Sequence, residues 1–126
     1  MQENPGEFDI DTAPSPEQRD VFIDCEFTNL VDPELLSIGL VADDGRELYV
    51  ELTGAEHLAN ASTYVLDTDI PQFGLVGYQE TSRIDIGKRV GAWLLGFGEA
   101  SIAVRFDYLA DMVLLKAVLR SAGTLD

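Results

Sequence analysis

Asp24 and Glu26 are the two residues whose types and spacing most directly suggest chemistry. They lie in residues 21–27, VFIDCEF, a run of β-branched, aromatic and acidic residues that predicts a strand. Because side chains alternate across a strand, both carboxylates point to the same face. The opposite face then carries only apolar side chains, those of Val21, Ile23, Cys25 and Phe27.

A strand this hydrophobic is expected inside a sheet, where two adjacent carboxylates repel each other and an unpaired one normally takes up a proton. A divalent cation resolves both problems, because Mg²⁺ and Mn²⁺ prefer carboxylate oxygens as ligands. The simpler alternative is a solvated polar face, which many antiparallel strands have. The Asp-Cys-Glu pattern by itself leaves both interpretations open.

Two more strands are predicted after the first. Turn residues occupy 29–33, and residues 35–42 and 46–52 form the next two strand-like runs. The Asp-Gly pair at 44–45 is the signal of a tight hairpin, so these two strands are expected to be antiparallel.

Residues 53–80 give no clear periodicity. A short helix over 55–61 and an extended piece over 64–66 are compatible with the sequence. The remainder is predicted to be a loop, punctuated by Pro71, Gly74 and Gly77.

A long helix is predicted from the point where Thr81 or Ser82 can act as its N-cap. Gly96 marks its end. Gly87 and Gly91 lie four residues apart within it and cost about 1 kcal/mol each relative to alanine. We expect them to mark close packing of the helix on the sheet.

A fourth strand over 101–106 and a second long helix over 107–121 complete the predicted fold. A strand reached through a crossover helix usually lies parallel to its neighbour. The predicted class is therefore α/β, as a single domain over residues 21–126. Its central mixed sheet combines a three-stranded antiparallel meander with one parallel strand, and helices flank it.

Composition limits the classes of function. The 126 residues include 23 acids and 8 bases, for a net charge of −15, which argues against a nucleic-acid binder that relies on clustered Lys and Arg and against docking on anionic lipid. No stretch approaches the roughly 20 apolar residues of a membrane span. A single cysteine permits no internal disulfide, and the N-terminus has no secretory signal, so a cytoplasmic location is expected.

Residues 1–20 differ from the rest of the chain. They hold three of the five prolines, and their six acids and one base give a net charge of −5. This composition predicts a flexible acidic leader. In the alternative interpretation, residues 7–12, EFDIDT, pair as an edge strand.

The sequence from residue 21 to about residue 120 resembles the DEDD-type 3′–5′ exonucleases of the ribonuclease H-like superfamily, and is most similar to their small bacterial exoribonuclease branch. In that family, DxE is followed by a small or aromatic residue, Thr, and Gly or Asn, as in Asp24-Cys25-Glu26-Phe27-Thr28-Asn29. The following strand and hairpin match Ser37-Ile38-Gly39-Leu40 and Asp44-Gly45. The second motif resembles Arg105-Phe106-Asp107-Tyr108 with Asp111.

The resemblance implies a ribonuclease H-like fold and hydrolysis assisted by two Mg²⁺ or Mn²⁺ ions, about 3.5–4 Å apart. Asp24 would contact both ions, Glu26 one and Asp107 the other, with Asp111 as the alternative to Asp107. The substrate would be the 3′ end of single-stranded RNA or DNA, and the product a nucleoside 5′-monophosphate. The residues implied in substrate binding are Phe27, Thr28, Asn29 and Phe106.

The chain departs from the family pattern after Asp107. The family's fourth acid lies in an HxxxD or YxxxD motif on a last helix, and no such motif follows here. The last strand and helix of the family fold are therefore expected to be missing. His57, the only histidine, lies outside the family's general-base position. It is predicted to be a surface or hydrogen-bonded residue, with a general base as the less favoured alternative.

The second long helix is apolar nearly all round over residues 112–119, and the fourth strand would form a bare edge. We therefore expect a second copy of the chain, a partner chain or the leader to cover this surface.

Three functions stay open on these grounds. The first is a metal-dependent 3′–5′ exonuclease, with RNA the favoured substrate, weakened by the missing acid. The second is a non-catalytic relative that acts as a protein-binding module and whose acidic surface suits a basic partner. The third is an unrelated acidic α/β domain.

Overall fold

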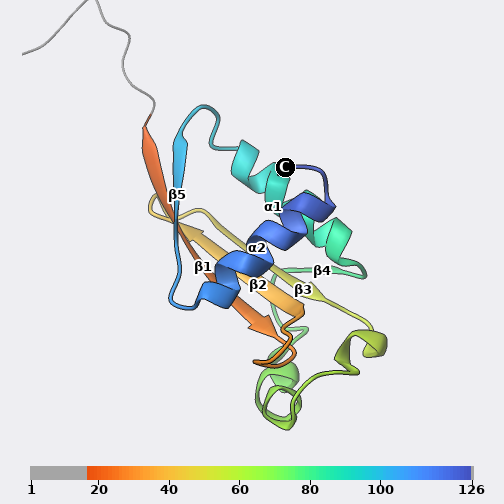
Figure 1. Ribbon diagram of the computed structural model, residues 1–126. Helices are drawn as coiled ribbons and strands as arrows, with labels where there is room; N and C mark the ends of the chain where they lie inside the picture. The colour runs from red at the N-terminus through yellow and green to blue at the C-terminus, as the bar shows by residue number, and fades with distance from the viewer. Residues whose placement is uncertain (1–16, 126) are drawn as a thin grey trace, which may run out of the picture.

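The computed structural model describes residues 17–125, which form a five-stranded mixed sheet with both long helices on one face (Figure 1). The spatial order of the strands is β4-β3-β2-β1-β5. The strands are β1 (Gln18–Phe27), β2 (Leu35–Ala42), β3 (Glu47–Leu52), β4 (Tyr78–Glu80) and β5 (Ser101–Arg105). The long helices are α1 (Arg83–Leu95) and α2 (Leu109–Ser121). The predicted α/β class is confirmed.

The strand pairings agree with the predicted pattern and extend it. β2 pairs antiparallel with both β1 and β3, and β5 lies parallel to β1. The predicted hairpin at Gly45 and the parallel placement of the strand after the first helix are thus confirmed. The short strand β4, parallel to β3, was not predicted because three residues carry too little pattern.

The two faces of β1 differ as the alternation predicts. Val21, Ile23 and Cys25 are buried beneath the helices. Asp24 is exposed and Glu26 is half-buried on the other face. The helices contribute apolar side chains to the same core as the strands, namely Ile86, Val90, Leu114, Leu115 and Val118. The helix-free face of the inner strand β1 is therefore where the two acids lie.

β1 begins three residues earlier than predicted. Gln18 pairs with Ser101 and Asp20 pairs with Ala103 of β5, so residues 18–20 belong to the sheet. The predicted leader boundary at residue 20 is therefore wrong, because the parallel partner strand extends β1 beyond its hydrophobic part. Residues 1–16, which include the alternative edge strand at 7–12, lie outside the described part of the chain.

The two helices pack tightly at glycine positions of α1. A Cβ atom added at Gly87 would lie 2.0 Å from the backbone oxygen of Val118, and one at Gly91 would lie 3.0 Å from Thr124. The predicted close packing is present, but its partner is α2 and the segment after it, not the sheet. The reason is geometric: Ile86 and Val90 face the sheet, so the residues next to them face α2.

The segment between β3 and β4 forms a small lobe at one end of the sheet, drawn in green in Figure 1. It contains two 3₁₀ helices, Ala55–Leu58 and Ile70–Gln72, and a π-helical turn, Val65–Asp69. The predicted short helix is confirmed in its first turn. The predicted extended piece at 64–66 is wrong, because Tyr64 has helical backbone angles and leads into the π-helical turn.

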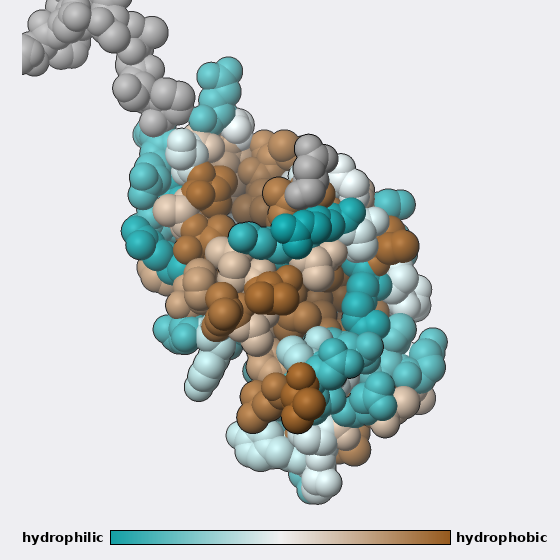
Figure 2. Space-filling model, in the orientation of Figure 1, coloured by the Kyte–Doolittle hydropathy of each residue, from teal (hydrophilic) through white to brown (hydrophobic). Residues whose placement is uncertain are grey.

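The second helix exposes apolar surface, as its composition predicts. Leu109 and Val113 of α2 and the adjacent Tyr108 are exposed, and Figure 2 shows brown, hydrophobic surface over α2. β5 is an edge strand of the sheet. Coverage of this surface by a second copy or a partner remains a prediction.

Neither α1 nor α2, nor any other helix within residues 17–125, combines the length and the apolar character that crossing a bilayer requires.

Candidate functional site

Asp24 and Glu26 lie in two cross-strand rows on the helix-free face of the sheet. Asp24 pairs with Gly39 of β2, which pairs with Tyr49 of β3. Glu26 pairs with Ser37 of β2 in the neighbouring row. A Cβ atom added at Gly39 would lie 3.6 Å from Cδ1 of the Tyr49 ring, and both residues line a cavity on this face.

The cavity has a volume of about 230 Å³. Its floor is formed by Ser37, Gly39 and Tyr49, with Asp24 and Glu26 along one side. Three residues of the green lobe complete its lining: Asp69, Gln72 and Phe73. The two acids that the sequence singled out therefore lie in an acidic cavity between the sheet and the lobe.

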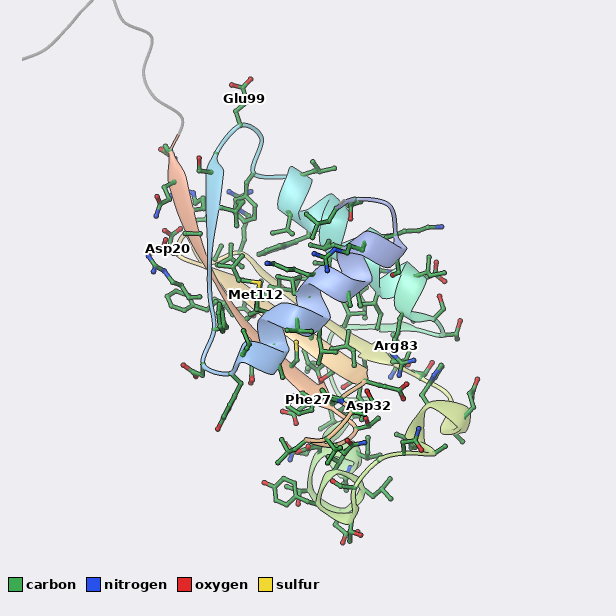
Figure 3. All side chains as sticks on the ribbon, viewed as in Figure 1. Asp20, Phe27, Asp32, Arg83, Glu99 and Met112 are labelled. Carbon is green, nitrogen blue, oxygen red and sulfur yellow. The ribbon has the colours of Figure 1, made fainter. Side chains whose placement is uncertain are left out.

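A larger cavity of about 520 Å³ lies at the end of β1. It shares Asp24, Glu26 and Asp69 with the first cavity. The rest of its lining is mainly apolar and aromatic: Cys25, Phe27, Asn29, Leu30, Ser62, Tyr64, Val65 and Tyr108. Figure 3 labels Phe27 at this end of β1, next to the lobe. The same three carboxylates thus line a small polar cavity and a larger aromatic one.

The carboxylates influence one another electrostatically. Burial raises the pKa of Glu26 to about 7, and the nearby carboxylates of Asp69, Asp24 and Asp111 add to the rise. A carboxyl group with such a pKa is partly protonated at neutral pH. The cluster is therefore a place where the fold concentrates more negative charge than it neutralises.

Asp111 is the most unusual acid of the site. It lies in the first turn of α2, only 1% exposed, and neither of its carboxylate oxygens has a hydrogen-bond partner. Burial raises its pKa, and the charge on Asp24 adds to the rise, while the backbone of Cys25 and Tyr108 acts in the opposite direction. A buried carboxylate without a full set of donors is costly, and a cation is the partner that suits it best.

The contact between Asp111 and β1 depends on where β5 ends. β5 pairs with β1 only as far as Phe22, so the rest of that β1 edge is open to the start of α2. There the Cys25 thiol makes a long contact of 3.9 Å with the backbone oxygen of Asp111. Burial raises the pKa of the Cys25 thiol, so this cysteine acts as an apolar packing residue and not as a nucleophile.

Asp107 and Asp111, the two acids proposed for the second motif, differ in burial, since Asp111 is only 1% exposed. Asp107 is exposed, precedes the first residue of α2 and is not a lining residue of either cavity. The sequence placed it first because an aromatic residue precedes it, as in the family motif. The helix geometry instead brings Asp111, one turn later, against Cys25 of β1, although Asp111 also lines neither cavity.

The other residues implied in substrate binding divide into two groups. Phe27 and Asn29 line the larger cavity. Thr28 is fully buried, and its Oγ1 accepts a hydrogen bond from Glu34 N at 3.1 Å, so it holds the turn and cannot touch a substrate. Phe106 is exposed and lines neither cavity. The aromatic residue from this segment that does line the larger cavity is Tyr108.

His57 has a structural position. Its Nε2 lies 3.1 Å from the backbone oxygen of Thr81, and it lines neither cavity. This contact fixes the Ala55–Leu58 helix to the start of α1. The interpretation of His57 as a hydrogen-bonded residue is confirmed, and its use as a general base has no support in this geometry.

Sequence reasoning missed Asp69, Tyr64 and Tyr108. Asp69 and Tyr64 lie in the segment that has no periodicity, and only the folded lobe brings them to β1. The nearest available signal was the pairing of an acid and an aromatic residue in a loop, which is too common to be specific. Among the described residues that line the two cavities, none is Lys or Arg.

The acids that line the two cavities are Asp24, Glu26 and Asp69. Among residues 17–125, no three His, Cys, Asp or Glu side chains converge closely enough to form a ready-made metal cage. Mg²⁺, however, usually keeps several waters and is held by one or two carboxylates together with substrate phosphates. Asp24 and Glu26, the two β1 carboxylates that line both cavities, fit that mode of binding.

No protein-family model matches the sequence, and no curated protein matches it.

Proposed function

We propose that the protein is a metal-dependent 3′–5′ exonuclease with a ribonuclease H-like fold, acting on the 3′ end of single-stranded RNA. The observation that carries the proposal is Asp111, a buried carboxylate whose oxygens have no hydrogen-bond partner and whose pKa is raised by burial and by the charge on Asp24. The arrangement of an inner strand bearing DxE, a parallel strand and then a helix bearing the next acid supports it.

Asp24, Glu26 and Asp111 would hold Mg²⁺ or Mn²⁺. When bound, such ions activate a water molecule and stabilise the charge of a phosphodiester undergoing in-line displacement. Binding would also offset the repulsion among the three carboxylates, which adds to the effect of burial in raising the pKa of Glu26. The site would thus be more stable with cation and substrate than without them.

The larger cavity would position the terminal nucleotide. Phe27, Tyr64 and Tyr108 offer aromatic surface, and base stacking on an aromatic ring contributes about 1–3 kcal/mol per base. Ser62 Oγ accepts a hydrogen bond from Val65 N at 3.2 Å, which leaves its proton free to donate to a ribose 2′-hydroxyl. This group is the reason for favouring RNA over DNA.

The acidic composition fits a site of this kind. With no Lys or Arg among the described lining residues, the site would hold a single 3′ terminus through metal and stacking rather than a long phosphate backbone. Tight binding to long nucleic acid is not expected from a chain with a net charge of −15.

The deciding experiment is hydrolysis of a 5′-labelled single-stranded RNA oligonucleotide with Mn²⁺ or Mg²⁺. We expect stepwise shortening from the 3′ end, release of nucleoside 5′-monophosphates, and loss of both on chelation. Asp24→Asn should abolish the reaction, whereas Asp67→Asn, an equal change of charge at an exposed residue, should retain it. Folded wild-type protein that releases no nucleotide with either metal would overturn the proposal.

A specific observation favours a second candidate, a non-catalytic protein-binding module. Tyr108, Leu109 and Val113 form an exposed apolar patch at the start of α2. In that case the melting temperature should not respond to Mg²⁺ or Mn²⁺. A metal-dependent rise in melting temperature that Asp24→Asn removes would exclude this candidate.

A further inference from the structure

We infer that residues 7–12, EFDIDT, add a sixth strand to the sheet, antiparallel to β5 on its outer edge. These residues lie outside the described part of the chain. Three features support the strand: the open edge of β5, the place where residues 1–16 join the sheet, and side chains that match across the edge. The strand is independent of the proposed function.

The outer edge of β5 has backbone groups that no strand within residues 17–125 uses, because β5 is the last strand of the sheet, next to β1. Ser101 N donates to Glu17 O at 2.9 Å, so the backbone groups of Ser101 face β1. These groups alternate in direction along a strand, and those of Ile102 and Val104 therefore point outward. An edge of this kind can pair with one more strand.

The same edge has apolar side chains that are incompletely buried. Ile102 and Val104 pack against the core beneath the helices but remain half-buried. Val21, which pairs with Val104 and has β2 on its other side, is fully buried. Hydrophobic surface is visible in Figure 2 at the position that β5 has in Figure 1. A further strand with apolar side chains on the helix side would complete the burial of this edge.

Residues 1–16 join the sheet beside this edge. Gln18, the first residue of β1, pairs with Ser101, the first residue of β5. A strand antiparallel to β5 would end at this same end of the sheet, two strand spacings or about 10 Å from β1. Residues 13–17 span up to about 16 Å when extended, so they can make the connection. Their two prolines suit a connection better than a paired strand.

The sequence of residues 7–12 alternates as the edge requires. Apolar or hydroxyl side chains occupy the even positions and acids the odd positions: Phe8, Ile10 and Thr12 against Glu7, Asp9 and Asp11. When the even positions share the helix side with Ile102 and Val104, all three acids face the helix-free side. A slip by one residue would turn the acids toward the core, so the pattern selects one orientation.

Charge matches across the edge as well. Arg105 is exposed and contacts Asp20 at 3.5 Å. With Ile10 opposite Val104, the residue opposite Arg105 is Asp9, and with Ile10 opposite Ile102 it is Glu7. Both registers therefore place an acid across from this base, which is a favourable cross-strand pair.

A second copy of the chain is a less favourable occupant of this edge. It would bring another net charge of −15 to the molecule. Residues 7–12 are already attached beside the edge, so their pairing loses less translational freedom than association of two chains.

Hydrogen exchange of single backbone amides in the full chain, followed by NMR, tests the strand. The Ile102 and Val104 amides should be protected in the wild type. Ile10→Ser should speed their exchange about tenfold or more, because it removes an apolar side chain from the helix side of the strand. Asp11→Ser, the matched control on the other face, should change it less than about threefold.

The Ala103 and Arg105 amides, which face β1, are the internal reference, and their exchange should stay the same in both variants. Unprotected Ile102 and Val104 amides in the wild type would overturn the inference. Protection that Ile10→Ser leaves unchanged would also overturn it, and a decrease of that protection on dilution would identify a second copy as the occupant. Equal effects of Ile10→Ser and Asp11→Ser would contradict the proposed orientation.

Discussion

Glu51 and Asp111 are both 1% exposed, yet their surroundings are opposite. One oxygen of Glu51 accepts from Gly74 N at 2.8 Å and Gln79 Nε2 at 3.4 Å, and the other accepts from Tyr49 Oη at 2.9 Å. Neither oxygen of Asp111 has a hydrogen-bond partner. The fold therefore supplies hydrogen-bond donors to both oxygens of Glu51 and to neither oxygen of Asp111.

This difference separates an acid that stabilises the fold through hydrogen bonds from an acid for which we propose a role in metal binding. By binding Gly74, Glu51 anchors the lobe whose residues line both cavities. The carboxylate oxygens of Asp111 have no hydrogen-bond partner, and burial, together with the charge on Asp24, raises its pKa. Burial alone does not distinguish structural from functional carboxylates; their donors do.

The largest expected effect is on catalysis. Asp111→Asn should slow release of the 3′ nucleotide by about 10³-fold, equivalent to about 4 kcal/mol in the activation barrier. Its free energy of unfolding should stay within about 1 kcal/mol of the wild type or rise, because the substitution removes a buried charge. Single-turnover kinetics and urea denaturation measure the two effects. If the variant hydrolyses RNA at the wild-type rate, the lack of hydrogen-bond donors around Asp111 is unrelated to catalysis.

Substitution of Glu51 should mainly lower the stability of the fold. Glu51→Met has a similar volume but leaves the donors of Tyr49 and Gly74 unpaired, so it should lower the free energy of unfolding by about 2–4 kcal/mol. Urea denaturation gives this value directly. Stability equal to that of the wild type would contradict the role of Glu51 as an anchor.

A smaller effect concerns pH. The pKa of Glu26 rises from 4.5 to about 7 in the folded, metal-free protein. Between these values the folded state holds a proton that the unfolded state has lost, so stability should fall as pH rises from about 5 to 8. We expect a loss on the order of 1–2 kcal/mol from this residue, allowing for solvent screening.

Glu26→Gln tests this prediction, and Glu34→Gln is its control because Glu34 is exposed. Glu26→Gln should flatten the dependence of the metal-free melting temperature on pH, and Glu34→Gln should leave it unchanged. Equal slopes in the two variants would remove Glu26 as the source of the effect.

The smallest effect is expected at Asp107. Because it is exposed and lines neither cavity, Asp107→Asn should change the rate of nucleotide release less than about threefold. Its free energy of unfolding should change less than about 0.5 kcal/mol, as is usual for surface substitutions. A loss as large as that of Asp111→Asn would reverse the assignment of the two acids.

The sequence was informative where local pattern and tertiary structure agree. The alternation in β1 correctly predicted that Asp24 and Glu26 share a face, and the Asp-Gly signal predicted the hairpin between β2 and β3. Both features depend on residues close together in the chain, where periodicity and turn chemistry are reliable guides.

The sequence failed where position depends on distant contacts. No local sequence pattern distinguishes the exposed Asp107 from the buried Asp111. Which of the two is buried depends on how α2 packs against the edge of β1 that lies beyond the end of β5. Asp69 reaches the site only through anchors on the β1–β2 turn and on Glu51. The glycines of α1 correctly indicated close packing, but only the folded protein shows that their partner is α2.

The parallel pairing of β5 with β1 also has a consequence for the order of folding. The β1–β2–β3 meander closes short loops and can form early, whereas β5 and α2 join β1 only after most of the chain is available. During synthesis, at about 5–20 residues per second, Asp24 and Glu26 emerge seconds before Asp111. A nascent chain that stops before α2 therefore carries the first two acids but not the third, and has no complete site.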